Sequence, residues 1–187
     1  MLGISALVFM VTALAAAEAS DQKKEIRMEP QIKKCPEFVV VGLKALRDYG
    51  KQGNEGELWG QMGQYFDSLA SVASLEYCYG VNAVISKDST ARDVFDYYAA
   101  VKLTSPGSAV SAPLGKLAIP QLQYAEFSFP FKAMEESIKY ASKQWLPQSG
   151  YVRDESAPIY DFVRFPGKTD GNSIVMYAIP VKKKHGH

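Results

Sequence analysis

The stretch Trp145-Leu146-Pro147-Gln148-Ser149-Gly150-Tyr151 decides how the second half of this chain is read. A helix ends there on an aromatic residue, because proline and glycine stop a helical run and turn the chain. The segments that follow, 157–165 and 173–181, are rich in β-branched and aromatic residues, which is typical of strands. The stretch therefore predicts a helix followed by two terminal strands.

The order of elements before this stretch occurs twice along the chain. In the second half, segment 116–129 predicts a strand interrupted by Pro120, and 131–146 predicts a helix with Met134, Ile138, Ala141 and Trp145 on one face. In the first half, 38–43 predicts a buried strand, 57–74 a helix, and 79–85 with 95–103 a hairpin. Segment 104–113, rich in Pro, Gly, Ser and Ala, is the connector.

Two βαββ units, about 36–104 and 114–182, therefore predict an α+β fold. Its antiparallel sheet would carry two main helices on one face, with a groove between the repeats. The 187 residues, 47% hydrophobic and 22% charged, suit one globular domain, which we assign to residues 36–184. A formal net charge of +1 argues against a nucleic-acid partner, and we expect a monomer.

The first 19 residues predict an export signal. Residues 2–17 are apolar or small and end near Ala15-Ala16-Ala17-Glu18-Ala19, which offers small residues at signal-peptidase spacing. The run is shorter than the roughly 20 residues of a comfortable membrane span. We expect a periplasmic or secreted protein without a stable membrane span after cleavage, or a membrane-anchored one if the signal is retained. Residues 20–35 then form a linker and 185–187 a tail.

The histidines and cysteines restrict the chemistry. The only histidines are His185 and His187, at the very end of the chain, which makes a Ser-His-Asp triad, a Cys-His pair or a His-rich metal site improbable within the fold. We expect no metal and no cofactor. Cys35 and Cys78 would lie in a disulfide-permissive compartment after export, and either a bridge or two separate thiols is compatible with the sequence.

Four local motifs, in order and at suitable spacing, resemble the GyrI-like family over about residues 38–182. They are Val40-Val41-Gly42, Ile119-Pro120 with Tyr124-Ala125-Glu126-Phe127, the stretch 145–151, and Ile179-Pro180-Val181-Lys182. The resemblance implies a pocket between the repeats that takes flat, often cationic, small molecules. It also implies an acid on the penultimate strand with an aromatic before it. That position holds Asp161 after Tyr160, where the family usually has glutamate.

Strand alternation indicates the surroundings of Asp161. Alternate residues of a strand point to opposite faces, so Asp161 shares its face with Ile159, Val163 and Phe165. A carboxylate among apolar side chains must be compensated by a cation or have a raised pKa. Asp161 is therefore either a counter-charge or general acid, or a structural acid satisfied by a neighbouring side chain or a backbone amide.

A second acid and several aromatic residues are further candidates. Glu126 shares a face with Tyr124, and a solvent-facing position is its simpler interpretation. Tyr97 and Tyr98 point to opposite faces of one strand, which predicts that one is core and the other exposed. The remaining candidates for a pocket lining, chosen for stacking and cation–π contact, are Tyr98, Tyr124, Tyr160, Tyr177 and Trp145.

These features favour a stand-alone domain that binds a small, partly aromatic and possibly cationic molecule in an acid-centred cleft. One alternative is a hydrolase of electrophilic small molecules, which some family members are, using a cleft carboxylate and a tyrosine. Another is a haem-binding or protein-interaction module of the related SOUL-like fold. Haem would then need an axial ligand other than a core histidine.

Overall fold

The computed structural model describes residues 28–48, 53–84, 86–87, 93–165 and 170–184. The predicted signal peptide, residues 20–27 of the predicted linker and the predicted tail lie outside these residues. Within them, no helix is long and apolar enough to cross a membrane.

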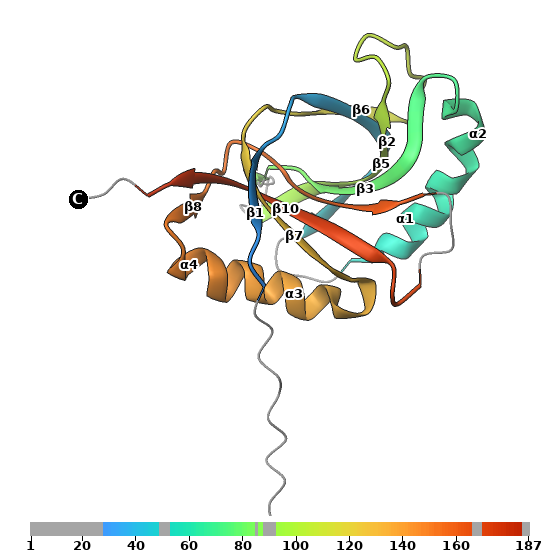
Figure 1. Ribbon diagram of the computed structural model, residues 1–187. Helices are drawn as coiled ribbons and strands as arrows, with labels where there is room; N and C mark the ends of the chain where they lie inside the picture. Colours follow the sequence, from blue (N-terminus) through green and yellow to red (C-terminus); the bar gives the residue numbers. More distant parts are fainter. Residues whose placement is uncertain (1–27, 49–52, 85, 88–92, 166–169, 185–187) are drawn as a thin grey trace, which may run out of the picture.

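In the described residues, ten strands form one antiparallel sheet that curls strongly (Figure 1). They are β1 (Gln31–Lys34), β2 (Phe38–Asp48), β3 (Ala73–Asn82), β4 (Ser86–Lys87), β5 (Asp93–Leu103), β6 (Gly115–Ile119), β7 (Gln123–Pro130), β8 (Tyr151–Arg153), β9 (Ile159–Arg164) and β10 (Ile174–Lys183). The sheet order is β1-β7-β10-β9-β3-β5-β2-β6, with β4 on β5 and β8 on β10. Together with the helices, this confirms the predicted α+β fold.

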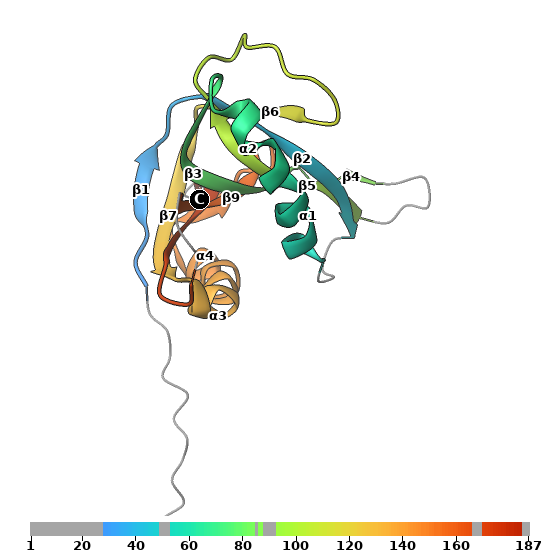
Figure 2. The ribbon, with the colours of Figure 1, turned by 90° about the vertical axis from the view of Figure 1, so that its right-hand side faces the viewer.

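Two helical segments pack on the same face of the sheet. The first consists of α1 (Glu55–Met62), a 3-10 turn and α2 (Phe66–Leu69); the second of a 3-10 turn, α3 (Met134–Tyr140), a π-helical turn and α4 (Leu146–Gln148). The Asn54 side chain caps α1 by accepting a hydrogen bond from the backbone of Glu57. Figure 2 shows α1 with α2, and α3 with α4, on one side of the sheet.

The two repeats exchange strands at the ends of the sheet. β1, which precedes the first repeat, pairs with β7 of the second, and β6, the first strand of the second repeat, pairs with β2 of the first. At the centre, β3 and β9 join the repeats. The predicted strand 116–129 is therefore two strands, split at Pro120, and each belongs to a different half.

The position of β1 corrects the prediction that residues 20–35 are a linker. Residues 31–34 lie inside the predicted linker, yet they form β1 and pair with Gln123–Glu126 of β7. Their charged, short sequence carries no periodicity that marks a strand. The partner strand and the Lys33–Glu126 ion pair at 2.5 Å hold them in place.

Three hydrophobic clusters make up the core. One lies between α1, α2 and the sheet around Met62 and Val101, and another between α3 and the sheet around Phe127 and Ile179. The third fills the opposite face, where the curl brings residues from β2, β6, β7 and β9 together. Both faces are therefore covered, which is why Tyr97 and Tyr98 are both buried, at 8% and 7% exposure. The prediction that one of them is exposed was wrong.

Gly42 allows β5 to lie close against β2. A Cβ atom there would lie 2.0 Å from the carbonyl oxygen of Ala99, so only glycine fits against β5. The pairing of β2 with β6 ends at this residue, while the pairing with β5 continues to Asp48.

Candidate functional site

Asp161 lies at the middle of the sheet face that carries both helical segments. The strand register places it opposite Gly80 of β3 on one side and Tyr177 of β10 on the other, and Gly80 is in turn opposite Ala99 of β5. Paired residues of neighbouring strands point to the same side of a sheet. Since Ala99 belongs to the α1 cluster and Tyr177 to the α3 cluster, Asp161 lies between the two.

The acid is held in an apolar environment. Burial raises the pKa of Asp161 from an ordinary value of 3.8 to about 7, and a hydrogen bond to its own backbone opposes the rise. The residue nevertheless keeps part of its surface exposed. A carboxyl group that is surrounded by protein yet reached by solvent is expensive to ionise, and a cation placed next to it lowers that cost.

Gly80 leaves room above the sheet for the groups of the site. A Cβ atom on Gly80 would lie 2.7 Å from the Tyr97 hydroxyl oxygen and 2.8 Å from the nearer carboxylate oxygen of Asp161. The Tyr97 hydroxyl oxygen and the nearer Asp161 carboxylate oxygen both lie next to this Cβ position, so they are close to each other. The missing side chain brings a phenol from β5 and a carboxylate from β9 together over β3.

Tyr97 connects the site to α1. The indole Nε1 of Trp59 donates a hydrogen bond of 3.0 Å to the Tyr97 hydroxyl. Because indole is a donor only, the phenol oxygen is the acceptor and its own proton remains available to a further partner. Burial and the negative charge of Asp161 raise the pKa of Tyr97, so the phenol stays protonated at neutral pH.

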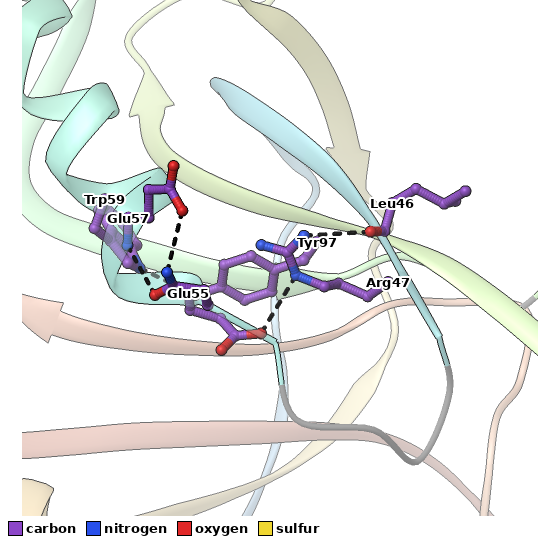
Figure 3. A network of polar contacts seen from close by, with 7 residues as sticks. Leu46, Arg47, Glu55, Glu57, Trp59 and Tyr97 are labelled. Carbon is purple, nitrogen blue, oxygen red and sulfur yellow. Dashed lines mark hydrogen bonds and ion pairs between the residues drawn. The ribbon is translucent and has the colours of Figure 1, made fainter.

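A pair of charges lies beside this tyrosine. Arg47 Nε and Glu55 Oε1 are 3.5 Å apart, and Arg47 also donates to the carbonyl oxygen of Leu46 at 3.2 Å. Figure 3 shows this pair next to Tyr97 and Trp59, at the junction of β2, β5 and α1. The Arg47 charge lowers and the Glu55 charge raises the pKa of Tyr97, and both effects are smaller than that of Asp161.

The sequence-predicted residues fall on two faces of the sheet. Tyr177 lies directly opposite Asp161 on the helix face. Trp145 is on the same face but packs against Phe127 and Tyr151, with ring centroids 5.2 and 6.3 Å apart, in the α3 cluster.

Four predicted residues lie on the opposite face and are not brought together with Asp161. Tyr98, Tyr124 and Tyr160 belong to the third cluster, where Tyr124 and Tyr160 have ring centroids 5.3 Å apart. Glu126 is only 8% exposed and pairs with Lys33, so its solvent-facing interpretation was wrong. The neighbour that buries Glu126 is β1, a strand that the sequence did not predict.

Sequence reasoning missed three residues of the site: Gly80, Tyr97 and Trp59. One signal was present for Tyr97, because it alternates with Ala99 and Val101 on the face that α1 covers. Its proximity to Asp161 depends on the registers of two strand pairs, which the sequence does not indicate.

The two cysteines are free thiols that lie in clusters on opposite faces of the sheet. Cys78 is in the α1 cluster, where burial raises its pKa to about 11, and Cys35 packs against the third cluster. This arrangement contains no disulfide. Among the described residues, no group of three or more His, Cys, Asp or Glu side chains could hold a metal ion.

Two surface pockets, of about 420 and 320 Å³, lie elsewhere, on the side of α1 and α2 that faces the connector. Tyr65 borders both, and neither is lined by Asp161. Their walls carry apolar and amide groups such as Leu58 and Gln61, together with Lys44, but no carboxylate. The acid and phenol are therefore the stronger candidate for recognition of a cationic ligand.

A curled antiparallel sheet made of two βαββ repeats is the fold of a class of small-molecule-binding domain. The chain belongs to this class: residues 28–182 match the GyrI-like small molecule binding domain family. Among functionally curated proteins, no sequence matches the chain.

Solved structures share the fold at low sequence identity. SAV2435 bound to tetraphenylphosphonium superposes with a TM-score of 0.61 at 17% identity, covering 83% of this chain and 94% of that one. The EcmrR C-terminal domain gives 0.60 at 13% identity, covering 85% and 100%. An integron cassette protein from Vibrio cholerae gives 0.52 at 17% identity, covering 82% and 96%.

Proposed function

We propose that this domain binds a small aromatic cation next to Asp161, on the sheet face between α1 and α3. The observation that carries the proposal is the partly exposed carboxyl group whose ionisation is opposed by burial. A cationic ligand would supply the missing counter-charge, and the ligand's own aromatic groups would contact the surrounding apolar and aromatic side chains.

The chemistry of the neighbours supports a ligand with a defined orientation. Asp161 offers an acceptor, and the Tyr97 hydroxyl offers a proton that its bond with Trp59 leaves free. Tyr177 adds a ring directly beside the acid. All these residues belong to one chain, so we infer that a monomer is sufficient for binding. The similar fold of SAV2435, whose structure contains tetraphenylphosphonium, makes this compound a suitable first probe.

The proposed location is outside the cytoplasm, with cleavage after residue 19 and membrane anchoring as the alternative. The apolar run of residues 2–17 and the alanines before residue 20 support it. Expression of the full chain, followed by mass determination of the mature protein, tests the cleavage.

Binding is tested by thermal shift with tetraphenylphosphonium and with the neutral triphenylphosphine oxide at pH 8. We expect the cation to raise the Tm of the wild type and the neutral compound to raise it much less. Asp161→Asn should abolish this preference. Glu126→Gln is the matched control, because it makes the same chemical change on the opposite face of the sheet. Equal shifts for both variants would overturn the proposal.

A hydrolase remains the second candidate, because one observation favours it. A carboxyl group with a pKa near 7 beside a protonated phenol suits general acid–base catalysis at neutral pH. If the domain turns over an electrophilic ester or epoxide, Asp161→Asn should lower kcat much more than it raises KM. A pure binding domain shows no turnover with either form.

A further inference from the structure

The second half of β2 forms an open sheet edge. β5 pairs with β2 from Val40 to Asp48, whereas β6 pairs with it only from Phe38 to Gly42. In the described part of the chain, no strand pairs with the outer edge of residues 43–48. The pairing with β6 ends at Gly42, opposite Gly115, so the outer edge of residues 43–48 is available to another strand.

An apolar side chain lies at the middle of this edge. Leu46 is 60% exposed, more than any other large hydrophobic residue that the structure describes. Figure 3 shows its side chain pointing away from Tyr97 and α1. Lys44 and Asp48 are two residues before and after it, so strand alternation places all three on the same face.

This pattern is complementary to itself. In an antiparallel pair that is centred on Leu46, the leucines of two copies lie opposite each other, and Lys44 of each copy lies opposite Asp48 of the other. Opposite charges that face each other across a strand pair are favourable, and like charges are unfavourable. Lys44 already contacts Asp96 at 2.7 Å and is exposed, so its ammonium group can be shared between two carboxylates.

We propose that the free edge of β2 pairs with the same edge of a second copy of this chain, about a two-fold axis at Leu46. An isologous contact of this kind closes as a dimer. The edge is short compared with the roughly 1,200–2,000 Å² that stable complexes bury, so the dimer is weak and reversible. It leaves Asp161 accessible, because Leu46 points away from the helix face. The proposed dimer is in equilibrium with the monomer that the sequence predicted.

The competing interpretation is that the charges protect the edge from association, as lysines on edge strands often do. The two are distinguished by sedimentation velocity on the full chain over a concentration series. We expect the sedimentation coefficient to rise with concentration. Leu46→Lys should weaken association at least about tenfold, while Ile174→Lys, which changes another exposed apolar residue at 53% exposure, should not. A constant coefficient for the wild type, or equal behaviour of both variants, overturns the proposal.

A charge exchange tests the register. Lys44→Glu and Asp48→Lys should each weaken association by about threefold to tenfold, because each puts like charges opposite one another. The double variant should restore it. Asp96→Asn is the control, since it removes the contact of Lys44 within one chain and leaves the proposed contacts between copies intact. A double variant that associates no better than the single ones overturns the proposed pairing. Circular dichroism confirms that each variant is folded.

Discussion

Asp161→Asn should stabilise the ligand-free protein at alkaline pH and change its stability little at acid pH. The side chain keeps its size and loses only its ionisation. The pKa of Asp161 is about 7 in the folded chain, against 3.8 as its ordinary value. Between these values the folded state binds a proton that the unfolded state has lost. The free energy of unfolding of the wild type therefore falls as pH rises from about 4 to 7, and stays reduced above 7.

The size of the effect follows from the two pKa values. One pKa unit corresponds to about 1.4 kcal/mol, so a change from 3.8 to about 7 sets an upper limit near 4 kcal/mol. Because Asp161 is partly exposed, solvent screens its charge, and we expect about 1–3 kcal/mol. The asparagine variant should be more stable by this amount at pH 8.5.

The assay is urea unfolding of the wild type and the variant at pH 4.5, 6, 7 and 8.5. Glu135→Gln serves as control, because Glu135 is an exposed acid of α3. A stability difference that is the same at pH 4.5 and 8.5 would refute the reasoning, since an unperturbed carboxyl group makes no such pH-dependent contribution. The same titration predicts that affinity for a cation rises with pH through 7, as Asp161 ionises.

Three further substitutions probe the surroundings of the acid and the edge of the sheet. Gly80→Ala should cost about 1–3 kcal/mol of stability and weaken binding of the cation, because its methyl group would lie 2.7 Å from the Tyr97 hydroxyl; urea unfolding and thermal shift measure both. Trp59→Phe removes the hydrogen bond to Tyr97 and should cost about 0.5–1.5 kcal/mol, again by urea unfolding. Glu126→Gln removes the pair with Lys33, so hydrogen exchange of the β1 amides should become faster while that of α3 is unchanged.

The sequence predicted the repeats and the position of the acid because both depend on local patterns. Apolar spacing identified the helix that ends near Trp145, and alternation placed Asp161 on the same face as Val163, which packs against the α1 cluster. Proline and glycine separated these elements. Such signals are contained within a few residues and do not depend on the rest of the fold.

The remaining features depend on contacts between distant segments. Tyr98, Tyr124 and Tyr160 were predicted for the site because they are aromatic and lie on strands, but the curl of the sheet buries them on the opposite face. Tyr97 reaches Asp161 only through the pairing of β5 with β3 and of β3 with β9. No local pattern encodes these registers.

The exchange of β1 and β6 between the two halves has a consequence for the unfolding of the domain. Because β1 completes the second half and β6 completes the first, a fragment containing one half alone would lack an outer strand supplied by the other. The duplicated units are thus interlocked, and neither is a separable module. Removal of either half should therefore unfold the rest of the domain, including the site proposed for the ligand.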